Sequence, residues 1–86
     1  MGKITVKFGT PLNLFLKLEK YEMDIDGPIK ILDLERELLE RFPQLKDRTA
    51  NMKYVYYVLD NKTVRDRETI VAEGQEIMLY QPTLGG

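Results

Sequence analysis

The sequence predicts an α+β domain in which one main helix lies across one face of a mixed β-sheet of four to five strands. Two observations favour this class. Several short segments alternate apolar and polar residues, as half-buried strands do, and one segment has the 3.6-residue apolar period of a helix. The chain has 86 residues, which fit one domain. We place this domain at residues 1–82 and expect residues 83–86 to form a flexible C-terminal tail.

The first part of the chain is expected to form a hairpin. Residues 4–8 and residues 21–25 both alternate with a period of two, so we predict two strands that pair with each other. Residues 12–20 between them fit either a short helical turn or another alternating strand. The sequence Asp-Gly-Pro at 26–28 indicates a turn, because Gly and Pro interrupt regular structure.

The clearest helix in the chain follows this turn. Its apolar residues recur on one side of a helical period, at Ile31, Leu34, Leu38, Leu39, Phe42 and Leu45. Its charged residues are assigned to the other side, which we expect to be solvated, namely Glu35, Arg36, Glu37, Glu40 and Arg41. Pro43 should end the regular helix near Phe42, because proline cannot continue the hydrogen-bond pattern.

The second part of the chain predicts the remaining strands. Residues 54–59 are aromatic, β-branched or leucine, which is typical of a strand, with Tyr57 and Leu59 inward and Tyr56 and Val58 outward. A tight turn at 60–62 leads to a short returning strand at 63–64. Residues 65–75 are polar and end in a turn, and residues 77–80 form the last strand, which Pro82 ends.

Composition argues against several classes of function. Thirteen basic and 14 acidic residues give a net charge of −1, so neither a nucleic-acid groove nor a polybasic membrane patch is expected. Apolar stretches are far shorter than the roughly 20 residues that span a bilayer. The chain has no Cys and no His, which removes the usual thiol nucleophile, general base and zinc ligands. We therefore expect no metal site, no catalytic residues and no enzyme activity from this chain alone, and a cytoplasmic location.

Several segments, taken in their order along the chain, carry a family resemblance. They are residues 4–8, the helix at 34–42, residues 58–61, residues 73–77, and the end of the chain from Tyr80 to Gly86. Together they resemble the β-grasp, ubiquitin-like sulfur carriers of the MoaD and ThiS type, and most of all the small subunit of molybdopterin synthase, the MoaD family. The resemblance spans nearly the whole chain and implies the β-grasp fold.

The same resemblance implies a function for the tail. An E1-like adenylating enzyme would use ATP to adenylate the carboxylate of Gly86, and a sulfur donor protein would convert it to a thiocarboxylate. The large subunit of molybdopterin synthase would then receive this tail and transfer sulfur to a pterin precursor. Gly85 and Gly86 have no Cβ and fit a narrow channel, while Thr83 and Leu84 would anchor the tail. The chain itself is expected to bind no cofactor.

The resemblance also implies a surface that docks both partners. Met78 and Tyr80 should lie on the side of the last strand opposite to Ile77 and Leu79, because side chains alternate along a strand. An apolar patch around Tyr80 would bind the activating enzyme and the large subunit, and Met and Tyr are common interface residues. Thr63 lies where family members often have an apolar residue in this patch. A lone exposed aromatic residue is the alternative reading of Tyr80.

Three other functions fit the same sequence. The tail could form an isopeptide bond between Gly86 and a lysine of another protein, as ubiquitin-like modifiers and small archaeal modifier proteins do. It could carry sulfur in the thiamine pathway instead. The chain could also be a plain interaction domain with a passive tail, and deletion of Gly85 and Gly86 would then change nothing.

Overall fold

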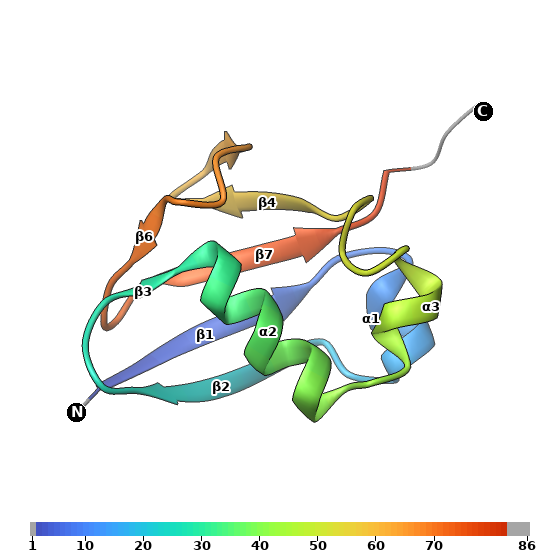
Figure 1. Cartoon of the computed structure of the whole chain (residues 1–86), viewed down its shortest axis with the longest axis horizontal. Coiled ribbons are helices and arrows are strands. Elements are labelled where there is room, and N and C mark those ends of the chain that lie inside the picture. Colours follow the sequence, from blue (N-terminus) through green and yellow to red (C-terminus); the bar gives the residue numbers. More distant parts are fainter. Residues whose placement is uncertain (1, 83–86) are drawn as a thin grey trace.

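A five-stranded mixed sheet forms the body of the chain in a computed structural model that describes residues 2–82 (Figure 1). The strands are ordered β2-β1-β7-β4-β5 across the sheet. Their bounds are β1 Gly2–Phe8, β2 Lys20–Ile25, β4 Tyr56–Leu59, β5 Lys62–Val64 and β7 Glu76–Tyr80. The first two strands form the predicted antiparallel hairpin, and β1 pairs in parallel with β7. The last strand therefore lies at the centre of the sheet, between β1 and β4.

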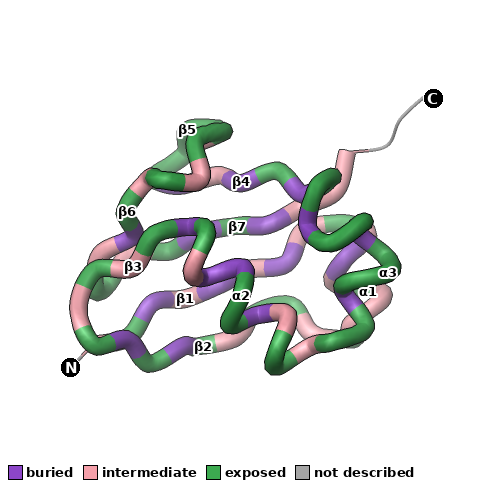
Figure 2. The backbone as a smooth tube through the Cα atoms, viewed as in Figure 1, coloured by how far each residue is buried: buried purple, intermediate pink, exposed green. Residues whose placement is uncertain are grey.

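One helix covers one face of this sheet, as the sequence predicts. Helix α2, Ile31–Arg41, crosses in front of the strands, and the buried residues of the sheet lie beneath it (Figures 1 and 2). The helix ends at Arg41, with Phe42 as its C-cap, so the stop expected before Pro43 is confirmed. The core combines residues of the helix, such as Leu34 and Leu38, with inward residues of the strands, such as Ile77 and Leu79.

Two short helices and a small second sheet complete the fold, and the sequence predicted them only in part. Of the two alternatives for residues 12–20, the structure has a helix, α1 at Leu12–Leu16. Leu45, which we assigned to the main helix, is buried but begins a separate helix, α3 at Leu45–Arg48. A small second sheet, not predicted, pairs β3 (Ile29–Lys30) with β6 (Ile70–Val71).

The strand predicted at 54–59 begins two residues later than expected, at Tyr56. Before it, the backbone makes a left-handed turn in which Ala50, Asn51 and Met52 have φ angles of 51°, 60° and 69°. Non-glycine residues rarely adopt this conformation, which costs roughly 1–2 kcal/mol per residue. Tyr54 is the last residue of the turn, and its side chain is exposed.

The turn between β4 and β5 follows from its residues. Leu59 pairs with Lys62, which leaves a loop of only Asp60 and Asn61, and both have positive φ angles, 52° and 65°. This is the backbone of a type I′ hairpin turn, and Asp and Asn tolerate it better than most residues. The short returning strand is therefore confirmed.

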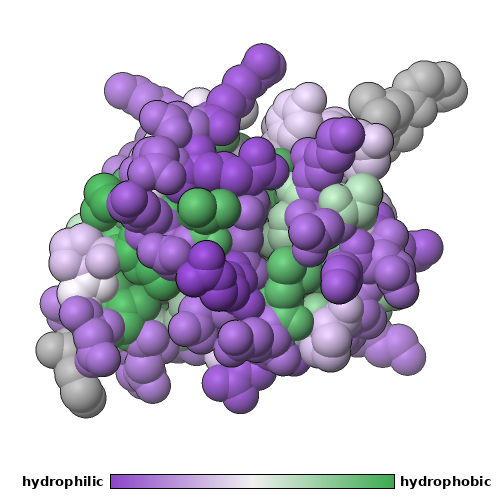
Figure 3. Space-filling model, viewed as in Figure 1, coloured by the Kyte–Doolittle hydropathy of each residue, from purple (hydrophilic) through white to green (hydrophobic). Residues whose placement is uncertain are grey.

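The surface on the helix side is mainly hydrophilic, with smaller hydrophobic patches between the charged side chains (Figure 3). Within residues 2–82 no helix is both long enough and apolar enough to cross a membrane.

Candidate docking face and the exit of the last strand

The face of the sheet opposite α2 carries the residues that the sequence assigned to docking. Ile77 and Leu79 are fully buried under the helix, whereas Met78 lies on the other side with 36% of its surface exposed. The predicted alternation of the last strand is therefore confirmed. The same holds for β4, where Tyr57 and Leu59 are buried and Tyr56 is exposed.

Strand register brings four open-face residues into one row across the sheet. Lys7 pairs with Met78, Met78 pairs with Val58, and Val58 pairs with Thr63. Thr63 and Met78 are thus two positions apart in one row. Lys7 at the end of the row contacts Glu76, with 3.4 Å between Nζ and Oε2, so the row has charged residues at its β1 end.

A second row joins the exposed Tyr56 to the half-buried Tyr80. Tyr56 pairs with Tyr80, and their ring centroids are 5.8 Å apart with the planes tilted by 55°. Beside them Gly9 donates from its N–H to the Leu79 carbonyl at 2.6 Å. A Cβ on Gly9 would lie 2.9 Å from the Tyr80 Cβ, so only glycine fits this close approach. Gly9 therefore helps to place Tyr80 at the edge of the patch.

Met78 stands between two shallow hollows of the open face. One, about 340 Å³, is lined by Lys7, Phe8, Glu19, Lys20 and Met78. The other, about 210 Å³, is lined by Val58, Asp60, Asn61, Glu76 and Met78. An apolar, flexible side chain between two hollows with charged rims has the anatomy of a protein interface, in which an apolar centre is surrounded by a polar rim.

We define the open-face patch as Tyr56, Val58, Thr63, Met78 and Tyr80. Tyr56 and Val58 were expected to point outward but were not assigned to docking. Their pairing with Tyr80 and Met78 is what places them there. The sequence alone does not give the register between strands that are distant in sequence, so it could not assign Tyr56 and Val58 to the patch.

The chain leaves the sheet from its central strand, beside α1 and α3 (Figure 1). After Tyr80, the side-chain amide of Gln81 donates from Nε2 to the Arg48 carbonyl at 3.0 Å. The Arg48 guanidinium lies 4.5 Å from the centre of the Phe15 ring, which links both short helices to the exit. The tail residues named from the sequence, Thr83, Leu84, Gly85 and Gly86, lie outside the described residues.

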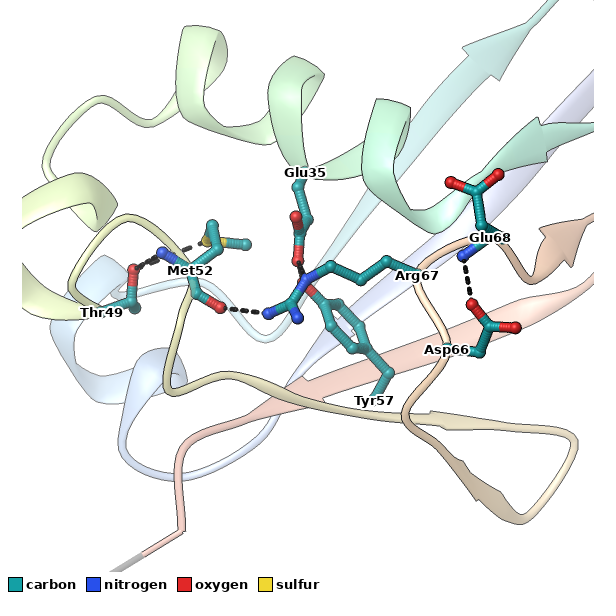
Figure 4. Close-up of polar contacts among 7 residues, drawn as sticks. All are labelled: Glu35, Thr49, Met52, Tyr57, Asp66, Arg67 and Glu68. Carbon is teal, nitrogen blue, oxygen red and sulfur yellow. Dashed lines mark hydrogen bonds and ion pairs between the residues drawn. The ribbon is translucent and has the colours of Figure 1, made fainter.

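A buried polar network lies on the helix side, and there the sequence interpretation was wrong. Glu35, which we placed on the solvated face of the helix, is only 7% exposed. Its carboxylate accepts hydrogen bonds from the Tyr57 hydroxyl and from Arg67 Nε, the latter at 2.7 Å (Figure 4). Residue 35 is four residues after Ile31 and three before Leu38, so its position on the apolar stripe could have revealed its burial.

The network also fixes the left-handed turn. Arg67 Nη2 donates to the Met52 carbonyl at 2.8 Å, so Arg67 joins helix α2 to the turn, while Glu35 joins the helix to Tyr57 of strand β4 (Figure 4). The buried Thr49 hydroxyl accepts from the Met52 N–H at 2.8 Å. Burial, followed by the hydrogen bond to Glu35, raises the pKa of Tyr57. The same carboxylate, through its hydrogen bond, raises the pKa of Arg67.

Residues 2–82 present surfaces for contact rather than a metal site. In this part of the chain no three His, Cys, Asp or Glu side chains come together as a metal site would need. What the structure does provide is a largely apolar patch on the open face and one hydrogen bond at the exit from β7.

Comparisons with solved structures give close matches in fold. SAMP1 of Haloferax volcanii, a small archaeal modifier protein, matches with a TM-score of 0.82 and 20% identity over 99% of this chain and 100% of that one. A putative molybdopterin converting factor subunit 1 of Pyrococcus furiosus matches with a TM-score of 0.78 and 15% identity, covering 96% of this chain and 100% of that one.

A third structure is a complex of subunits 1 and 2 of the molybdopterin-converting factor of Helicobacter pylori. It matches with a TM-score of 0.67 and 21% identity, over 98% of this chain and 99% of the matched chain. No protein-family model matches the sequence, and neither does any curated protein sequence. At these identities the matches establish the fold. The predicted β-grasp fold, with its likeness to molybdopterin converting factor subunits, is confirmed.

Proposed function

We propose that this chain is a sulfur carrier whose C-terminal Gly86 is loaded as a thiocarboxylate and donates sulfur as the small subunit of a molybdopterin synthase. The observation that carries the proposal is the continuity between the open-face patch and the tail. Tyr80 belongs to the patch and also ends β7, so only Gln81 and Pro82 separate the patch from Thr83. A partner bound to this patch would be adjacent to the start of the tail.

The likeness to the Pyrococcus furiosus and Helicobacter pylori proteins supports this reading. The Helicobacter pylori structure is a complex of subunits 1 and 2, so a chain of this fold can act as one subunit of an assembly. In the proposal the large subunit supplies the catalytic groups, and this chain is a regenerated reagent with no cofactor of its own. It works in the cytoplasm with an E1-like adenylating enzyme and a sulfur donor protein.

Loading of Gly86 with sulfur takes two steps. The Gly86 carboxylate attacks the α-phosphate of ATP, and pyrophosphate leaves to give an acyl-adenylate. Hydrosulfide then attacks the acyl carbon, AMP leaves with the electron pair of the broken C–O bond, and loss of a proton from sulfur gives the thiocarboxylate. Transfer of that sulfur to an acceptor and addition of water restore the carboxylate. The adenylating enzyme supplies the ATP site for this sequence.

The decisive experiment measures the intact mass of the chain after incubation with ATP, sulfide and the adenylating enzyme of the same organism. The expected result is a gain equal to replacement of one oxygen by sulfur, absent when Gly86 is deleted. If an enzyme that demonstrably adenylates the chain produces no such gain, the sulfur-carrier function is wrong.

A docking test uses two exposed apolar residues on opposite sides of the molecule. Met78→Glu places a charge in the centre of the open-face patch, whereas Leu32→Glu places the same charge on the exposed side of α2. We expect Met78→Glu to weaken binding to the adenylating enzyme at least about tenfold and Leu32→Glu to leave it unchanged. Equal effects would remove the patch from the docking surface.

A second function has its own supporting observation. SAMP1 of Haloferax volcanii gives a TM-score of 0.82, above those of the two converting-factor structures. As a modifier, this chain would use the same adenylate, but a lysine amine would displace AMP and form an isopeptide bond. Covalent adducts that contain the chain, depend on ATP and disappear on deletion of Gly86 would establish this function, and the mass assay would separate it from sulfur loading.

A further inference from the structure

A third hollow, of about 160 Å³, lies where the left-handed turn approaches the segment after β5. It is lined by Lys53, Val55, Tyr56, Tyr57, Val64, Arg65 and Arg67. Three of these residues are cationic, and none of those found to line it in residues 2–82 is acidic. The chain as a whole has a net charge of −1, so this concentration of positive charge is a local feature.

One of the three cations is held firmly in place. Arg67 donates from Nε to Glu35 at 2.7 Å and from Nη2 to the Met52 carbonyl at 2.8 Å. Figure 4 shows its side chain stretched between the helix and the turn, above Tyr57. These contacts use two of the five guanidinium donors and fix the plane of the group. A held guanidinium with spare donors is suited to an oxyanion, because little side-chain entropy is lost on binding.

The other two cations have no ion-pair partner within residues 2–82. Lys53 and Arg65 are exposed, and neither is within salt-bridge distance of a carboxylate in the described part of the chain. The nearest carboxylates in sequence have other contacts. Asp66 accepts the N–H of Glu68, and Glu68 pairs with Lys30 at 2.8 Å. In Figure 4 both carboxylates point away from the guanidinium of Arg67.

The floor of the hollow decides which anion fits. Val55 and Tyr57 are buried, and Val64 is half-buried, so the cations surround an apolar base. A glutamate side chain matches this arrangement, since its methylene groups can cover the apolar base while its carboxylate reaches the cations. A free phosphate would leave the apolar base in water and gain nothing from it.

We propose that this hollow binds the side-chain carboxylate of a glutamate on a protein partner of this chain. Tyr56 connects it to the docking surface, because Tyr56 lines the hollow and also packs against Tyr80 in the open-face patch. A partner that covers the patch can therefore reach the hollow across the edge of the sheet. In this respect the inference rests on the docking part of the proposed function, but not on the chemistry of the tail.

The first test is an NMR titration of the ¹⁵N-labelled chain with N-acetylglutamate N-methylamide. We expect saturable shifts of backbone amides at residues 53–57 and 64–67. The neutral probe N-acetylglutamine N-methylamide should bind about tenfold more weakly, because charge-assisted hydrogen bonds are the stronger ones. Absence of saturable shifts, or equal binding of both probes, would overturn the proposal. Tighter binding of inorganic phosphate would identify a free-oxyanion site and also overturn it.

Matched double variants assign the shifts to the hollow. Lys53→Gln with Arg65→Gln removes the two unpaired cations, and we expect it to abolish the saturable shifts. Arg36→Gln with Lys46→Gln makes the same change of charge on α2 and α3 and should leave them intact. All four residues are exposed, so both variants should fold, which the dispersion of their spectra will verify. Equal loss in both variants would show only general charge attraction and contradict the assignment.

The second test uses the adenylating enzyme of the same organism. We expect the Lys53→Gln, Arg65→Gln variant to bind it about tenfold more weakly than the wild type, and with a smaller salt dependence. Unchanged affinity would overturn the role of the hollow in docking. Failure of the wild type to bind, or to gain sulfur, would count against the proposed function instead, so the two failures are distinguishable.

Discussion

The two faces of the sheet are built from the same strands but are constrained differently. On the face under α2 every inward residue of β7 is fully buried, and the one buried carboxylate of the described residues, Glu35 of α2, is hydrogen-bonded. On the open face Met78 is 36% exposed, and no helix of the described part of the chain covers it. Packing on the covered face therefore sets the stability of the fold, whereas side chains on the open face are under less constraint.

The largest effect is expected from a comparison of two neighbouring residues of β7, one on each face of the sheet. Ile77→Ala removes buried methyl groups and leaves a cavity, so we expect the free energy of unfolding to fall by about 2–5 kcal/mol. Met78→Ala, on the open face, should cost less than about 1 kcal/mol. Urea denaturation measures both. Similar losses at the two positions would show that the open face also supports the fold.

The second test concerns the buried carboxylate. Glu35→Ala leaves the Tyr57 hydroxyl and the Arg67 guanidinium without their shared acceptor, and we expect a loss of about 2 kcal/mol. Glu40→Ala, on the exposed side of the same helix, is the control and should change stability by no more than about 0.5 kcal/mol. Equal changes in denaturation midpoint would mean that the network contributes nothing beyond helix propensity.

Local patterns predicted most of the covered face, because alternation and helical period are properties of neighbouring residues. They predicted the main helix, its end before Pro43 and the direction of Tyr57. They failed for Glu35, where we weighed residue type above position on the apolar stripe. They also failed for the two-residue strands β3 and β6, which exist only through a pairing of Ile29 with Val71 that is distant in sequence.

The candidate site was predictable to a similar extent and for similar reasons. The alternation of β7 placed Met78 on the open face, but the row from Met78 through Val58 to Thr63 needed the register between strands. The cationic hollow gave no sequence signal, since Lys53 and Arg65 come together only through the left-handed turn and the β4–β5 hairpin. The assignment of Gly86 as the reacting residue stays a prediction.

The third test uses pH to isolate the network. Because its pKa is raised, Tyr57 keeps its proton in the folded chain at pH values where the unfolded chain loses it. The contribution of Tyr57 to the free energy of unfolding is therefore complete below about pH 10, the usual tyrosine pKa. Above that pH the contribution is lost, by up to about 1.4 kcal/mol per pH unit.

Tyr57→Phe should remove this part of the decline, whereas Tyr54→Phe, at an exposed position, should leave it as in the wild type. Denaturant titrations at a series of pH values between 9 and 11, run in parallel on the three proteins, give the three slopes. A slope that persists in Tyr57→Phe would assign the decline to lysines or to other tyrosines.

The smallest expected effect concerns the left-handed turn, which the network holds at the edge of the covered face. Ala50 has a φ angle of 51°, a region that glycine adopts without steric cost. Ala50→Gly should therefore stabilise the chain by about 0.5–1 kcal/mol, after allowing for the greater entropy of glycine in the unfolded chain.

The only other alanine, Ala72, is not among the residues with positive φ and is the matched control. There the same substitution gains no relief of strain and should destabilise by about 0.5–1 kcal/mol. Opposite signs for one substitution at two positions would show that the turn stores strain, and that Arg67 and Thr49 hold a conformation which the backbone alone disfavours. Equal signs would show that the turn is relaxed, and the cationic hollow beside it would then owe its shape to packing alone.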